Sequence, residues 1–162
     1  MRIDIRPPED VDWRLLEDSV GRAVNDTLAA GAMLVANDAK RSIAQGPKTG
    51  RIYTTRFARN RTTGAIFPTE ARVPHQASAP GEPPATDTGK LIGSIVAGAK
   101  DLRAYVEARS VYALWLEYGT RYMLARPFLL PAFERNRQAL ADMVRAAVAT
   151  AVSQWQRKGG RA

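Results

Sequence analysis

Apolar side chains recur at intervals of three or four residues along the first third of the chain. Between Glu9 and Gln45 they are Leu16, Val20, Val24, Leu28, Leu34 or Val35, Ala39 and Ile43. This spacing places them on one face of a helix, which Gly46-Pro47 ends. We expect a helix of about 33 residues, about 50 Å long at 1.5 Å per residue, that either bends at Gly31 or projects to meet a neighbour.

The middle of the chain changes to short β-rich segments separated by turn residues. Residues 51–57 on one side, and residues 65–68 and 71–73 on the other, flank the turn-forming stretch Asn60–Gly64 and predict a hairpin, whose mobile part we place at 54–73. Three prolines and a glycine then predict an extended loop over residues 76–86. Further elements are expected in this order: a short helix over Asp87–Ile95 with an Asp or Thr cap, and strands at Ile95–Ala99 and Ala104–Arg109.

Aromatic and aliphatic residues dominate the segment that leads to the last helix. Residues 111–118 predict a short helix that Gly119 ends, and a loop follows. The final helix is expected over Pro131–Gln156, with apolar positions Phe133, Leu140, Val144, Val148 and Val152. Residues 1–8 and 157–162 are expected to form an N-terminal arm and a frayed tail. The order helix, strands, helix predicts one mixed α and β domain over residues 1–162.

The basic charge of the chain raises the question of nucleic acid. The 24 lysines and arginines exceed the 16 acidic residues by eight, which favours partners with phosphates or carboxylates. The basic residues are scattered, except in two places. One is the tail with Arg157, Lys158 and Arg161, and the other is a cluster on the predicted hairpin that interleaves arginines with aromatics. This cluster, the candidate contact with DNA or with a ring neighbour, consists of Arg51, Tyr53, Arg56, Phe57, Arg59 and Arg61. The alternative is that the hairpin is simply a solvated surface.

Other chemistry finds little support in the residues. The chain has no cysteine and one histidine, His75, which excludes disulfides, thiolate metal sites and paired-histidine sites within one chain. Glu117 can be grouped with Asp87, Glu82 and His75 as a divalent metal site. We prefer a structural contact of Glu117 with Arg121 or Arg126, within one subunit or between subunits. No catalytic, cofactor-binding or metal-binding residue is therefore assigned, and no cofactor is expected. With no apolar run near 20 residues and no signal-like start, no membrane association is expected either.

Two segments resemble the head–tail joining or tail-completion family of long-tailed lambdoid phages. This family is also called gene-product-ten-like and is similar to minor tail protein Z. Residues 75–95, HQASAPGEPPATDTGKLIGSI, resemble its SAPGEPP…DTGxLxxSI stretch. Residues 112–133, YALWLEYGTRYMLARPFLLPAF, resemble its YAxxxExGT…ARPFLxPA signature. The resemblance extends over most of residues 10–155, while the stretch Thr54–Val73 departs from it as a long insertion.

The resemblance implies an α+β fold in which the N-terminal and C-terminal helices pack on a small antiparallel sheet. It also implies a non-enzymatic structural role in the virion neck, as a homo-oligomeric ring that joins the head-closure or connector proteins to the tail terminator or tail tube and lets DNA pass. The subunit would be made in the host cytoplasm. A small basic DNA-binding module is the alternative. We expect the interface to include Pro80, Gly81, Pro83, Pro84, Tyr112, Trp115, Leu116, Glu117, Tyr118, Gly119, Thr120, Arg126, Pro127 and Phe128.

Overall fold

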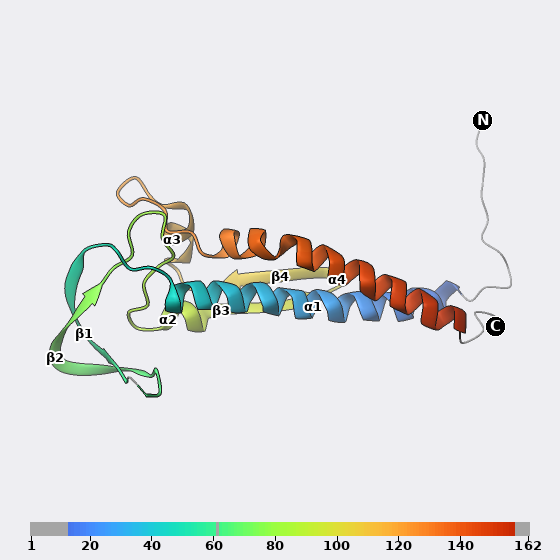
Figure 1. The fold of residues 1–162 in the computed structure, drawn as a ribbon, viewed down its shortest axis with the longest axis horizontal. Helices are drawn as coiled ribbons and strands as arrows, with labels where there is room; N and C mark the ends of the chain where they lie inside the picture. Colours follow the sequence, from blue (N-terminus) through green and yellow to red (C-terminus); the bar gives the residue numbers. More distant parts are fainter. Residues whose placement is uncertain (1–12, 61, 158–162) are drawn as a thin grey trace.

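Eight helices and strands make up the described part of the chain. The structure, a computed structural model, describes residues 13–60 and 62–157 (Figure 1). The elements are α1 (Trp13–Gln45), β1 (Ile52–Arg59), β2 (Ile66–Gln76), α2 (Lys90–Ser94), β3 (Ile95–Lys100), β4 (Arg103–Ala108), α3 (Ala113–Tyr118) and α4 (Leu129–Arg157). The predicted α+β class is confirmed, with a long N-terminal helix and a C-terminal helix. The expected arm at residues 1–8 and residues 158–162 of the expected tail lie outside the described residues.

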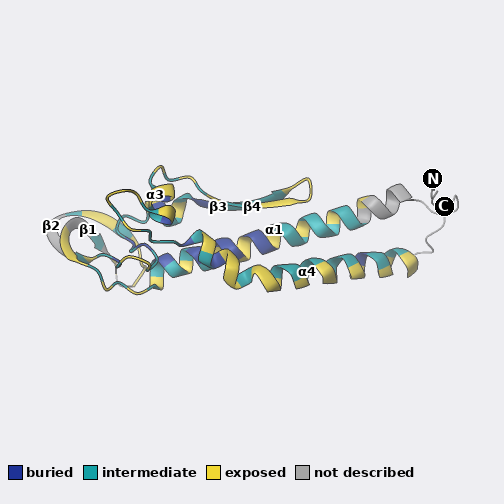
Figure 2. Cartoon of the chain, turned by 90° about the horizontal axis from the view of Figure 1, so that it is seen from above, coloured by how far each residue is buried: buried dark blue, intermediate teal, exposed yellow. Residues whose placement is uncertain are grey.

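Helices α1 and α4 lie side by side and run in opposite directions along the body (Figures 1 and 2). Helix α1 has 33 residues and continues through Gly31 without interruption. A side chain at Gly31 would collide with the end of Leu140 on α4, so the glycine allows the two helices to approach closely. The helix is therefore not interrupted at Gly31, and its projection to meet a neighbour stays a prediction.

The core lies where α1 meets β3, α2 and the start of α4. Its buried residues on α1 are Val35, Ala36, Ala39 and Ile43, and those from the rest of the chain are Leu91, Ile95, Ala113, Phe128 and Ala132. Phe128 is 1% exposed, and burial of such a side chain contributes about 1.5–3 kcal/mol. The sequence pattern left open whether Leu34 or Val35 belongs to the apolar face of α1. Val35 is buried, and Leu34 is 40% exposed. The predicted apolar face therefore runs through Val35.

The predicted strands form two separate two-stranded antiparallel sheets. Strands β3 and β4 pair from Ile95 with Ala108 to Lys100 with Arg103, close to the predicted bounds, and α1 packs against both strands. Figure 2 shows α1 between this sheet and α4. The sheet thus packs on α1, and α4 covers the other side of the same helix.

Strands β1 and β2 form the predicted hairpin, which lies beyond the C-terminal end of α1 (Figure 1). Its pairing shifts register between Thr55 and Phe57. At the tip, the side-chain oxygen of Asn60 accepts backbone N–H groups of Thr62 and Thr63 at 2.8 and 3.0 Å, which holds the turn. The hairpin is confirmed, and its mobility stays a prediction.

Three helix starts differ from the sequence expectation. Helix α3 begins at Ala113, two residues after the expected start at Val111. Helix α2 begins at Lys90 and not at Asp87, and its N-cap is Gly89 with φ 76°, without a side-chain cap. The expected Asp or Thr cap is therefore wrong, because the chain enters the helix through a left-handed turn that glycine adopts at little cost. Helix α4 begins at Leu129, two residues before the expected Pro131, and extends to Arg157. The earlier start follows from a capping contact described below.

Candidate functional site

Glu82 holds the proline-rich loop, residues 76–86, to Thr49 in the segment that follows α1. Its carboxylate accepts the Thr49 hydroxyl at 2.5 Å, the Thr49 backbone N–H at 3.1 Å and the Ala79 backbone N–H at 2.7 Å. These hydrogen bonds stabilise the ionised form and lower the pKa of Glu82, the contact with the Thr49 hydroxyl most of all. The loop is thereby fixed by side-chain contacts where its prolines prevent a regular hydrogen-bond ladder.

Glu117 holds the start of α4. Its Oε2 accepts the backbone N–H groups of Phe128 and Leu129 at 2.9 and 3.0 Å, and its Oε1 accepts that of Leu130 at 2.8 Å. The first N–H groups of a helix have no partner within the helix, and they favour negative charge. The expected contact of Glu117 with Arg121 or Arg126 is therefore wrong within the chain, because these backbone N–H groups occupy its carboxylate. A contact of Glu117 with an arginine of another subunit stays a prediction. Arg121 lies over the ring of Tyr122 and donates to its hydroxyl.

The two segments expected to form the interface lie against each other. The Nε of Arg126 donates to the carbonyl of Ser78 at 3.2 Å, and the N–H of Gly81 donates to the carbonyl of Ala125 at 2.9 Å. The N–H of Arg126 also donates to the carbonyl of Leu116 at 2.7 Å, which closes the loop between α3 and α4. The proline-rich loop and the α3–α4 segment thus form one continuous structural unit, although Ser78 and Arg126 are 48 residues apart.

The expected interface residues divide by exposure. Pro80, Gly81, Trp115, Tyr118 and Thr120 are exposed, and Pro83, Tyr112, Leu116, Gly119, Arg126 and Pro127 are half-buried. Pro84, Glu117 and Phe128 are buried in the single chain, so they lie beneath this surface and position it. Tyr122 and Leu124, in the loop after α3, are 81% and 70% exposed and extend the set of exposed apolar residues.

A large groove opens between α4, β4 and α3, with α1 as its floor. It has a volume of about 900 Å³ and we call it the apolar groove. Its large apolar lining residues are Leu28, Val35, Tyr105, Val106, Leu114, Tyr118, Leu129, Leu130, Phe133, Leu140 and Val144. Sequence reasoning assigned Phe133 to the apolar face of the last helix, yet its side chain is 43% exposed in the groove. The sequence signal for the groove was the density of apolar residues, which did not distinguish core from surface.

A smaller cavity of about 300 Å³ lies between the base of the β1–β2 hairpin and the proline-rich loop. Tyr53 and His75 line it with their ring centroids 5.1 Å apart. Burial, and then the charge of Asp87, raise the pKa of Tyr53. Lys90 and Arg126 also line the cavity, so its walls are mixed in polarity.

The candidate nucleic-acid residues are only partly placed. Arg51 precedes β1 and is exposed, and Tyr53 lies on β1 with 40% of its surface exposed. The side chains of Arg56, Phe57 and Arg59, and Arg61 as a whole, lie outside the described residues. The contact of this cluster with DNA or with a ring neighbour stays a prediction.

The metal-site hypothesis would bring Glu82, Asp87, Glu117 and His75 together. Glu82 and Glu117 are instead each engaged by their own set of N–H and hydroxyl donors. Among residues 13–60 and 62–157, no three histidine, cysteine or acidic side chains lie close enough to hold a metal ion.

Within the same ranges, no helix is both long and apolar enough to cross a membrane. No family model, no curated protein and no solved structure matches this chain.

Proposed function

We propose that the chain is a structural subunit that associates with copies of itself into a ring, and that this ring joins the head and the tail of a long-tailed phage. The resemblance of residues 75–95 and 112–133 to the head–tail joining family suggests the role. The observation that carries the proposal is the apolar surface that a single chain leaves exposed around α3 and the start of α4. We also propose that the ring binds the partners implied by the resemblance, namely the head-closure or connector proteins on one side and the tail terminator or tail tube on the other, and lets DNA pass.

The amount of exposed apolar surface supports association. Tyr118, Leu130 and Phe133 are 72%, 53% and 43% exposed along the apolar groove. Trp115 on α3 and Tyr122 in the loop after it are 55% and 81% exposed and do not line the groove. Large exposed apolar patches on a monomer mark interaction sites. The chain therefore offers both a concave and a separate exposed apolar surface.

Two different surfaces on one chain favour a ring over a symmetric dimer. Association through unlike surfaces is head-to-tail, and it produces a closed ring whenever the rotation between neighbours closes. The anchors at Glu82 and Glu117 fit this role, because they fix the two adjoining loops before assembly. A surface that is already ordered loses less conformational entropy on binding.

The test is the mass and shape of the purified chain over a range of protein concentrations, with and without short duplex DNA. We expect closed rings of one size by light scattering and negative-stain imaging. The variant Tyr118→Ser/Leu130→Ser should remain folded and lose assembly. The control Val111→Ser, at a residue 86% exposed and outside the groove lining, should assemble normally.

A strict monomer that binds DNA with a steep salt dependence would instead favour the alternative, a small basic DNA-binding module. A monomer at every concentration, indifferent to DNA, would contradict self-assembly as the basis of the function.

A further inference from the structure

The turn between β3 and β4 combines backbone strain with an exposed apolar side chain. Asp101 and Leu102 connect the paired residues Lys100 and Arg103, with φ values of 52° and 58°. They are the two non-glycine residues with positive φ among residues 13–60 and 62–157. Leu102 is 56% exposed. Hairpin turns of this kind favour asparagine followed by glycine, because both positions need positive φ.

Leucine at this position has no local explanation. In the left-handed region its Cβ crowds the backbone, and its exposed side chain gains little from burial within its own chain. Strained residues persist where the surrounding structure holds them in place, and they cluster at functional sites. The strain therefore suggests that Leu102 makes a contact outside its own chain.

The apolar groove has the complementary chemistry. The α4 side of its lining includes Phe133, Arg137, Leu140 and Val144. The guanidinium of Arg137 is therefore a positive charge in an otherwise apolar row of α4. Arg137 approaches Glu134 only at 3.9 Å, with both side chains mostly exposed. The other charged lining residue is Glu117, whose carboxylate oxygens accept three backbone N–H groups. The groove therefore favours an apolar side chain that has a carboxylate next to it.

We propose that the Asp101–Leu102 turn of one copy inserts into the apolar groove of a second copy. Leu102 enters the apolar part of the groove, and the carboxylate of Asp101 pairs with Arg137. Neither turn residue lines the groove of its own chain, so the two halves of the contact lie on different surfaces. This inference rests on the proposed function and names the contact between neighbours in the ring.

The first experiment exchanges the turn for its unstrained form. Asp101→Asn/Leu102→Gly creates the asparagine–glycine pair that this turn prefers, so the chain should unfold at the same or a higher temperature. Self-association, measured by analytical ultracentrifugation, should weaken at least tenfold. The control Lys100→Gln, next to the turn, should change neither. Rings that form with unchanged affinity from the exchanged chain would overturn this inference and leave the ring function intact.

The second experiment tests the pairing of charges. Asp101→Asn and Arg137→Gln should each weaken association, and the double variant should lose no more than the stronger single variant, because each substitution already removes the same ion pair. Losses that simply multiply in the double variant would show that the two residues do not contact each other.

A third experiment uses the absence of cysteine from the chain. Chains with Leu102→Cys are mixed under oxidising conditions with chains with Ala141→Cys, a small residue that lines the groove. The mixed disulfide should form faster than with Thr150→Cys, an exposed position on α4 outside the groove lining. Equal rates would overturn the contact. If the wild-type chain also stays monomeric, the proposed function fails with it.

Discussion

The Oε2 of Glu117 accepts the backbone N–H of Phe128 at 2.9 Å, so the last turn of α3 is joined to the residue before α4. The same carboxylate accepts the next two N–H groups. Glu117 is 8% exposed and Phe128 is 1% exposed. The contact therefore joins the two ends of the loop of residues 119–127 through the buried carboxylate of Glu117. It also fixes the positions of the exposed residues in that loop.

Replacement of Glu117 should destabilise the chain strongly. Glu117→Ala leaves three N–H groups near the core without their acceptor, and we expect a loss of about 3 kcal/mol in the free energy of unfolding. Glu117→Gln keeps one acceptor oxygen and should lose about 1–2 kcal/mol. Urea denaturation measures both. The control Glu134→Ala, which removes an exposed glutamate of α4, should change stability by less than about 0.5 kcal/mol. Similar losses at Glu117 and Glu134 would contradict the capping role.

Gly119 ends α3 in a conformation that alanine does not fit. Its φ is 77°, and an added Cβ would lie 2.8 Å from the carbonyl oxygen of Met123 and 2.9 Å from the nitrogen of Ala125. Gly119→Ala should therefore lose about 2 kcal/mol or more of stability. Gly21→Ala is the matched control, because Gly21 lies within α1 and the added Cβ would have no atom within 4 Å beyond the adjoining residues and backbone of its own helix. This variant should gain up to about 1 kcal/mol. Thermal unfolding should give opposite signs for the two variants.

The helices and hairpins were predictable because their signals are local. Helix α1 follows from apolar residues at helical spacing ended by Gly46-Pro47, and the hairpin tip follows from the turn residues between Asn60 and Gly64. The exact helix starts were less predictable. Helix α4 begins at Leu129 because Glu117, a residue of α3, caps it. Local capping patterns in the sequence do not predict a cap from another helix.

The candidate site was predicted in outline only. The proline-rich loop and the α3–α4 segment were both expected to contribute. Their contact joins the side chain of Arg126 to the backbone carbonyl of Ser78, a partner that no sequence pattern identifies. Apolar residues at helical spacing, such as Phe133, indicate that this face of the helix packs against something. Whether that partner belongs to the same chain depends on where β4 lies. The apolar groove is therefore a property of the tertiary arrangement.

Glu82 should make stability depend on acid pH. Hydrogen bonds from Thr49 and Ala79 lower the pKa of its carboxyl below the ordinary value of 4.5. A lowered folded pKa means that the contribution of Glu82 is present above pH 4.5 and is lost as the pH falls through the lower folded pKa. The melting temperatures of wild type and Glu82→Gln should differ most near neutral pH and converge as the pH falls below 4.5. A difference that stays constant with pH would contradict an ionised anchor.

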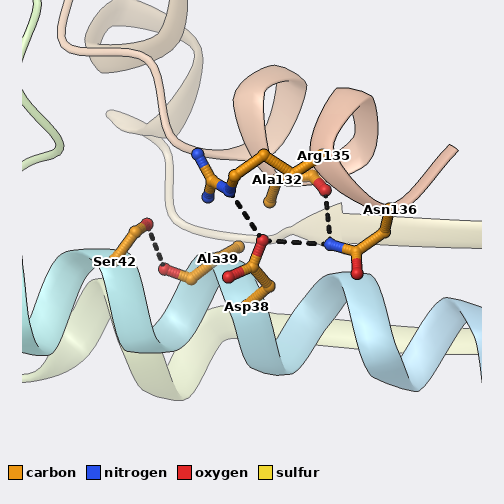
Figure 3. Close-up of polar contacts among 6 residues, drawn as sticks. All are labelled: Asp38, Ala39, Ser42, Ala132, Arg135 and Asn136. Carbon is orange, nitrogen blue, oxygen red and sulfur yellow. Dashed lines mark hydrogen bonds and ion pairs between the residues drawn. The ribbon is translucent and has the colours of Figure 1, made fainter.

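Asp38 should stabilise the packing of the two long helices. Its Oδ2 accepts the Nε of Arg135 and the Nδ2 of Asn136, each at 3.0 Å, so one carboxylate on α1 holds two side chains of α4 (Figure 3). Asp38→Ala should lower the free energy of unfolding by about 1 kcal/mol, since one end of two hydrogen bonds between helices is removed.

The matched control is Asp142→Ala. Asp142 also accepts two side chains, but both Gln138 and Arg145 belong to its own helix, and its side chain is 59% exposed. Its replacement should lower stability by no more than about 0.5 kcal/mol. Because Asp38 connects two elements that are about one hundred residues apart in the chain, its loss should also speed hydrogen exchange in both α1 and α4, whereas the loss of Asp142 should affect α4 alone. If the two variants lost equal stability and showed exchange confined to α4, the contact between the helices would contribute nothing to their packing.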